Sequence, residues 1–206
     1  MKQNLPVALA ILLMLVIAAC TPVTTPVEEV TPTQHLAPRG AFHPLTTQTG
    51  IESIDQVLTA VSSGDAGSLH SLIEFTNALC TQKEGLGGPP KCREGEVEGT
   101  PVEVLSFLGS EGNFLRRDQI KDWTGIDASG IYAIYEVNAA AISSEQYYPV
   151  GRYVIVLVSE GHEPAVALRI GERGIVRVDT VFDSSPEALR AMVEREASTV
   201  ILEPKS

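Results

Sequence analysis

The chain is poor in positive charge. Its 206 residues include 15 Lys and Arg against 26 Asp and Glu, which sets the formal net charge at −11 with neutral histidines. Proteins that hold nucleic acid through its phosphates need a basic run or patch, and no such run occurs here. Nucleic acid is therefore not an expected partner.

Cysteine and histidine are also scarce. The three cysteines are too few for a scaffold built on disulfides, and they form no pair of C-x-x-C motifs. Serine hydrolases need a nucleophile, a base and an orienting group within reach, yet no G-x-S-x-G motif is present. Of the four histidines, only His70 falls within an expected element, where packing or surface exposure suits it. We expect no catalytic residue, no metal and no cofactor.

No apolar run is long enough for a stable membrane span. Leu5 to Ala19 carries no charged or hydrogen-bonding side chain, with Pro6 as its one interruption. These 15 residues would span about 22 Å as a helix, against roughly 30 Å for the hydrocarbon core of a bilayer. Preceded by Lys2, the run is typical of a signal peptide.

The run ends in a motif that points to lipid attachment. Ile17-Ala18-Ala19-Cys20 resembles the bacterial lipobox, an aliphatic residue and two small residues before the cysteine that is lipidated. The resemblance implies that residues 1–19 are removed and that Cys20 carries acyl chains, palmitate among them, that hold the protein in the membrane. The other possibility is an ordinary secretory cleavage site that happens to precede a cysteine.

The segment after Cys20 suits a tether. Residues 21–41 contain five threonines and four prolines and show no apolar periodicity. Without residues 1–19, whose only charge is Lys2, the balance becomes 14 − 26 = −12. Anionic bilayer surfaces repel such a body, so the anchor must be the lipid. We expect an extracytoplasmic protein of the bacterial cell envelope, with residues 20–41 linking the lipid to the folded part.

The folded part begins with apolar residues at helical spacing. Ile51, Ile54, Val57, Leu58 and Val61 predict one helix, which Gly64 can end. A second helix is then expected, begun by Asp65 and carrying Leu69, Leu72, Ile73 and Thr76 on one face.

In the segments that follow, apolar residues recur with a period of two, as in β-strands. The β-branched and aromatic runs that predict strands are Val102–Leu108, Ile131–Val137, Tyr153–Val158, Val166–Ile170 and Ile175–Phe182. Residues 171–174 should join the last two strands as a hairpin, and Arg117–Trp123 could form a short helix. Ser185 and Pro186 then predict the start of a terminal helix.

Helices followed by a mostly antiparallel sheet of about five strands predict an α+β fold. We place the α+β domain at residues 42–183 and a C-terminal helix and tail at 184–206. Two opening helices, a Gly-Asp junction and the closing strand GIVRVD (174–179) resemble the NTF2-like (nuclear transport factor 2-like) cone, in which a curved sheet wraps a helix; a cystatin-like sheet is similar. In that family, acids inside the cone can serve as general bases.

Once Cys20 is assigned to lipid, Cys80 and Cys92 form an even pair. An exported protein meets an oxidising compartment, so a disulfide is expected rather than a metal site with His70, which lacks a fourth ligand.

The loop between the two cysteines fails as a phosphate-binding loop because Pro90, not glycine, precedes Lys91. The strings GLGGPPKC (85–92) and EGTPVEV (98–104) resemble a segment of bacterial exported proteins whose function is uncharacterised, so the resemblance implies no functional residue.

The remaining candidates for a pocket are charged and tyrosine residues of the sheet. Arg177 and Asp179 share one face of the last strand, with Arg169 nearby, and either belong to a solvated salt-bridged face or line a ligand site. Tyr132 and Tyr135 could line the same site, although tyrosines in strands more often belong to the core.

The expected function is a lipid-anchored binding or interaction module for a small molecule or an envelope protein. The alternatives are an NTF2-like enzyme that uses a carboxylate inside the cone, and a passive envelope protein. An apolar cavity that holds an ionisable group would favour the enzyme, and an exposed apolar patch would favour the module.

Overall fold

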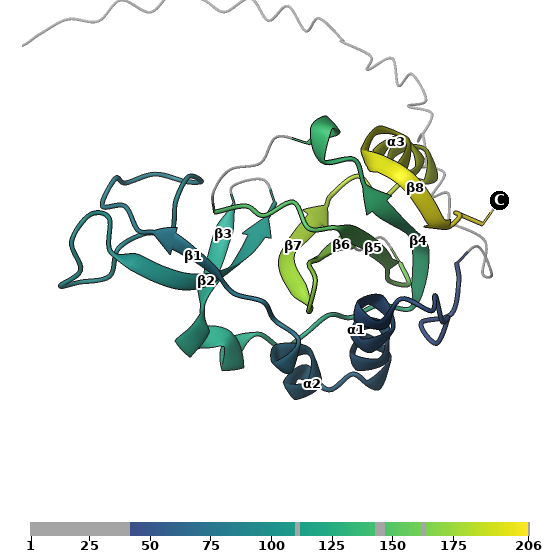
Figure 1. The fold of residues 1–206 in the computed structure, drawn as a ribbon, viewed down its shortest axis with the longest axis horizontal. Helices are drawn as coiled ribbons and strands as arrows, with labels where there is room; N and C mark the ends of the chain where they lie inside the picture. Colours follow the sequence, from purple (N-terminus) through teal and green to yellow (C-terminus); the bar gives the residue numbers. More distant parts are fainter. Residues whose placement is uncertain (1–41, 110–111, 143–146, 162–163, 206) are drawn as a thin grey trace, which may run out of the picture. The chain divides into compact units, whose positions relative to one another are not determined.

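The computed structural model describes residues 42–109, 112–142, 147–161 and 164–205. The expected signal peptide, Cys20 and the tether lie outside these residues. The described part is an α+β fold built on one large, mostly antiparallel, open sheet (Figure 1). Within it, no helix combines the length and the hydrophobicity that a membrane crossing needs.

Two helices open the described part, and strands with short 3-10 helices between them follow before a last helix and strand. In order they are α1 (Glu52–Ser63), α2 (Ala66–Ser71), β1 (Thr76–Leu79), β2 (Pro101–Leu108), β3 (Asn113–Arg116), η1 (Arg117–Asp122), β4 (Gly130–Val137), η2 (Ala139–Ala141), β5 (Tyr153–Val158), β6 (Ala165–Ile170), β7 (Ile175–Val181), α3 (Pro186–Glu196) and β8 (Ala197–Leu202). The strand order is β1-β2-β7-β6-β5-β4-β8, with β3 paired to β2.

Helices α1 and α2 pack on one face of the sheet. The apolar stripe of α1 is fully buried there, with Ile54, Val57 and Leu58 at 0% exposure. As expected, Gly64 ends α1 in the left-handed region at φ 66°, where its N–H bonds to the Val61 carbonyl, and the Asp65 carboxylate accepts from two N–H groups at the start of α2.

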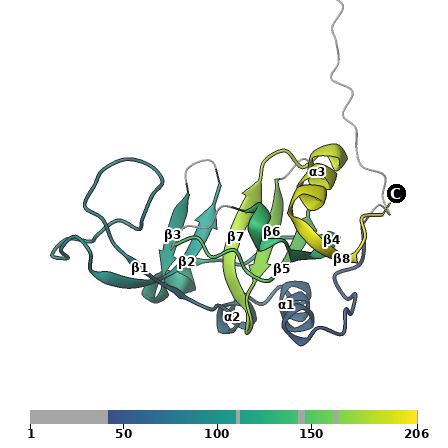
Figure 2. The same ribbon diagram turned by 45° about the horizontal axis from the view of Figure 1, so that its top comes forward.

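Helix α3 packs on the opposite face of the sheet (Figure 2). The Ser185 side chain caps it by accepting from the Ala188 N–H, and Pro186 occupies its first turn. Leu189, Met192 and Val193 are buried against the small side chains of β5 and β6. The central sheet therefore lies between α1 and α2 on one face and α3 on the other.

Strand β2 joins the central sheet to a smaller extension. It pairs in parallel with β7 at residues 106–108, and antiparallel with β1 at residues 101–104. Strand β3 takes the other edge of β2, which places β1 and β7 one after the other along the same edge. The connection from β1 to β2, residues 80–100, extends from this end of the sheet (Figure 1).

All five expected strands are present, but the expected count of about five is wrong because the sheet has eight. The additional strands are β1, β3 and β8. The sheet is open, and the NTF2-like cone stays a prediction.

The second helix is shorter than expected. It ends at Ser71, and Thr76 begins β1 instead of completing a helical face. The reason is a competing set of backbone partners: Leu72 and Glu74 exchange hydrogen bonds with Ile175, and Thr76 pairs with Val104. β-Branched Ile73 and Thr76 suit these extended positions better than a helix.

The predicted C-terminal tail is also a strand. Helix α3 runs directly into β8, which pairs antiparallel with β4 and covers that edge of the central sheet.

Candidate functional site

The sheet carries a row of polar side chains on its α3 face. The strand register places Tyr135, Val154, Arg169, Arg177 and Ser106 side by side across β4, β5, β6, β7 and β2. The alternation of β7 puts Asp179 on the same face. The sheet therefore does bring together Arg177, Asp179 and Tyr135, as the sequence suggested, with Arg169 between them.

These side chains form a buried network of ion pairs. Arg177 donates from Nε and Nη2 to both oxygens of Asp179, at 2.6 and 2.8 Å. Arg169 donates from Nε to Asp179 Oδ2 at 2.6 Å and from Nη2 to Glu196 Oε2 at 2.8 Å. The four residues are 2–8% exposed, so the ion-paired face is buried and not solvated.

Glu196 brings the end of α3 into the network. Its Oε2 also accepts from the Tyr135 hydroxyl at 3.0 Å, and its Oε1 accepts from Arg195. Burial opposes ionisation of Glu196, but the positive charge of Arg169 and the hydrogen bonds from Arg195, Arg169 and Tyr135 together outweigh it and lower the pKa of this carboxyl. Burial, and next the charge of Glu196, raises the pKa of the Tyr135 hydroxyl.

Backbone carbonyl groups of residues 147–150 accept further hydrogen bonds from the row. Arg177 Nη1 donates to the Tyr148 carbonyl at 3.4 Å, and Arg169 Nη1 donates to the Val150 carbonyl at 3.3 Å. The Ser106 hydroxyl donates to the Tyr147 carbonyl. The segment 147–150 therefore lies over the row and closes it.

The arrangement is poorly suited to proton transfer. A general base needs a lone pair that a substrate can approach. Both oxygens of Asp179 already accept from guanidinium groups, and the residue is 8% exposed. Two arginines and two carboxylates also balance in charge, which suits a structural cluster in the interior.

Tyr132 also lies on the α3 face of the sheet, and it contacts α3 itself. Its hydroxyl donates to the Pro186 carbonyl at 3.1 Å, and its ring packs in the core beneath the helix. Tyr132 and Tyr135 are thus core residues whose hydroxyl groups are bonded within the protein.

The histidines serve local structure where they are described. The His70 Nε2 lies 2.8 Å from the Trp123 carbonyl, and its ring stacks on the Trp123 ring. His43 pairs with Ile131 at the edge of β4, and its ring lies 2.8 Å from the Glu203 carbonyl. His35 and His162 lie outside the described residues.

Cys80 and Cys92 form a disulfide, with their Cα atoms 4.9 Å apart. This confirms the expected pairing. Cys80 directly follows β1. Within the described residues, the side chains close enough to share a metal ion are these two cysteines and Glu96. Sulfurs joined to each other are not thiolate ligands, so this set does not make a zinc site.

The disulfide closes an extension that we call the disulfide element, residues 79–101. Backbone hydrogen bonds join the two ends of the loop that the disulfide closes: the Thr81 N–H donates to the Pro90 carbonyl, and the Cys92 N–H donates to the Thr81 carbonyl. Cys80 packs in a small core with Ala78, Val102 and Val104.

Arg116 of β3 clamps the element to the sheet. Its guanidinium bonds both oxygens of Glu96, at 2.6 and 2.7 Å, and also donates to the Lys91 carbonyl at 2.9 Å. The Arg116 side chain is 11% exposed. The hydrogen bond from Arg116 is the main cause that lowers the pKa of Glu96 to about 2. A second pair, Arg93 with Asp118, adds an exposed tie to η1.

Three surface grooves lie away from the buried network. One of about 650 Å³ runs between α1 and α2, lined mainly by small and polar side chains such as Thr59, Ser63 and Ser68. Another of about 530 Å³ lies beside the β6–β7 hairpin, and a third of about 520 Å³ lies between α3 and β8. Arg169, Arg177 and Asp179 line none of the three.

Three residues of these ion pairs, Glu196, Glu96 and Arg116, were not predicted from the sequence. Glu196 had a signal, because Leu189, Met192, Val193 and Glu196 follow the spacing of a buried helix face. A carboxylate at that spacing must find a partner inside the protein. No sequence pattern pointed to Glu96 and Arg116, because their pairing depends on how the loop that carries Glu96 folds back over β3.

Comparisons with protein-family models, curated proteins and solved structures found no match for this chain.

Proposed function

We propose that the chain is a lipid-anchored, extracytoplasmic binding or interaction module of the bacterial envelope. The lipobox-like sequence before Cys20 and the Thr/Pro-rich residues 21–41 support the anchor. The net charge of −12 for residues 20–206 supports a lipid, and not a charged surface, as the means of attachment.

The observation that carries the proposal is the disulfide between Cys80 and Cys92. Such bonds persist in oxidising compartments and are rare where thiols are kept reduced, so the bond agrees with export. A disulfide that closes a loop outside the main core stabilises a surface feature, which suits recognition.

The buried network argues against the alternative of catalysis at Asp179. The alternative of an NTF2-like enzyme requires an accessible carboxylate, and Asp179 is the acid on the sheet that best fitted that role. Its two guanidinium partners and the covering segment 147–150 leave no approach for a substrate. Stability of the interior is the simpler role for these charges.

A fractionation experiment tests the anchor. The full chain and the Cys20→Ala variant are expressed in a bacterium that processes lipoproteins, and their distribution between membrane and soluble fractions is compared. We expect the variant to become soluble, while a control variant, Thr21→Ala, stays in the membrane. A Cys20→Ala protein that stays membrane-bound after signal cleavage would show that the anchor is wrong.

Native purification tests the module. The protein is extracted from membranes, and its small molecules and proteins are identified by mass spectrometry. A stoichiometric partner or ligand supports a binding module. Turnover of a copurifying molecule that Asp179→Asn abolishes, with the fold retained, would instead support the enzyme.

A further inference from the structure

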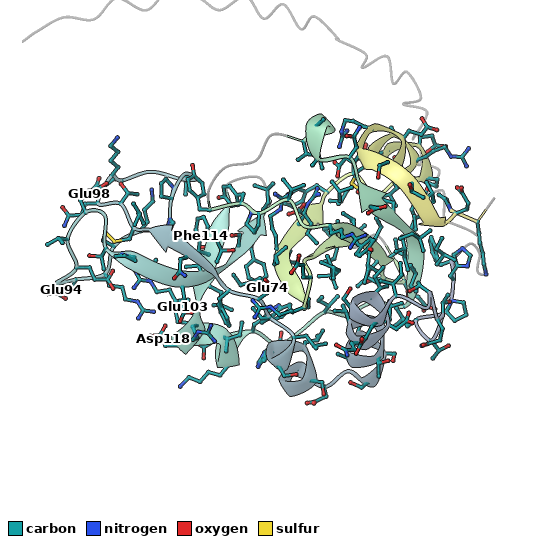
Figure 3. The ribbon with its side chains drawn as sticks, viewed as in Figure 1. Glu74, Glu94, Glu98, Glu103, Phe114 and Asp118 are labelled. Carbon is teal, nitrogen blue, oxygen red and sulfur yellow. A yellow bond between two sulfur atoms is a disulfide. The ribbon has the colours of Figure 1, made fainter. Side chains whose placement is uncertain are left out.

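We draw no further inference here: the strongest candidate, the exposed surface of the disulfide element around Leu86, with Glu94 and Glu98 on its outlying loops (Figure 3), carries no proposal because nothing among the described residues shows what covers it.

Discussion

Asp179 is the residue on which the buried charges depend. It accepts from both Arg169 and Arg177, and its removal as an anion would leave guanidinium charge in the interior without compensation. Breaking a buried pair in this way typically costs about 3–5 kcal/mol. We expect Asp179→Asn to lower the free energy of unfolding by that amount, measured by urea denaturation.

The exposed Asp127 provides a matched control for this substitution. Asp127→Asn should change the stability by less than about 0.5 kcal/mol, as surface substitutions usually do. An Asp179→Asn protein as stable as this control would mean that the network is open to water in solution and could serve a ligand after all.

Glu96 should give the protein a specific sensitivity to acid. Its pKa is lowered to about 2 in the folded state, from 4.5 in the absence of these contacts, because Arg116 bonds the ionised form. A carboxyl with a depressed folded pKa stabilises the fold fully above pH 4.5, and this stabilisation is lost as the pH falls toward 2. We expect Glu96→Gln to reduce the slope of stability against pH in this window, measured by urea unfolding at a series of pH values.

Glu84→Gln serves as the comparison, since Glu84 is exposed and has no ion pair among the described residues. It should leave the slope nearly unchanged. Equal slopes for wild type and Glu96→Gln would contradict the clamp between Arg116 and Glu96.

At the scale of elements, the disulfide stabilises a loop that has little core of its own. Joining Cys80 to Cys92 closes a short loop, for which chain entropy predicts about 3 kcal/mol of stabilisation. We expect the double substitution Cys80→Ser and Cys92→Ser to destabilise the protein by about that amount, measured by urea denaturation of the mature chain.

Thiol titration of the unfolded, unreduced protein checks the bond itself. Oxidatively purified protein with Cys20 replaced by alanine should contain no free thiol. Two free thiols, or one zinc ion per chain, would contradict the disulfide.

For the whole molecule, the boundary of the fold should fall at Phe42. Residues 21–41 offer no apolar face, whereas His43 exchanges two backbone hydrogen bonds with Ile131. A chain that begins at Phe42 should therefore melt at the same temperature as a chain that begins at Cys20, measured by circular dichroism. A loss of many degrees would show that the preceding segment packs on the domain.

A chain that begins at Thr46 is the informative contrast. It loses the pairing of His43 with Ile131 and the contact of His43 with the Glu203 carbonyl. This protein should melt several degrees lower. Equal melting temperatures for the two chains would show that the pairing at the edge of β4 adds no stability.

The local sequence was sufficient for elements whose residues agree with one another. The stripe from Ile51 to Val61 predicted α1, the continuous apolar run of Tyr153–Val158 predicted a central strand, and Ser185 with Pro186 predicted the start of α3. It was insufficient for β1, β3 and β8. Two of these have only four residues, and short strands form because distant partners satisfy their backbone groups.

The sequence by itself determined the α+β class, the strands β2, β4, β5, β6 and β7, and the pairing of Cys80 with Cys92. The strands follow from hydrophobic period, which is a local property, and the pairing follows from the number of cysteines. Only the tertiary structure decided whether Arg169, Arg177 and Asp179 face water or the interior. An alternating strand looks the same in sequence on a solvated face and on a buried one. Burial arises when Glu196 at the end of α3 and the carbonyls of residues 147–150 come from elsewhere in the chain to cover the row and satisfy its charges.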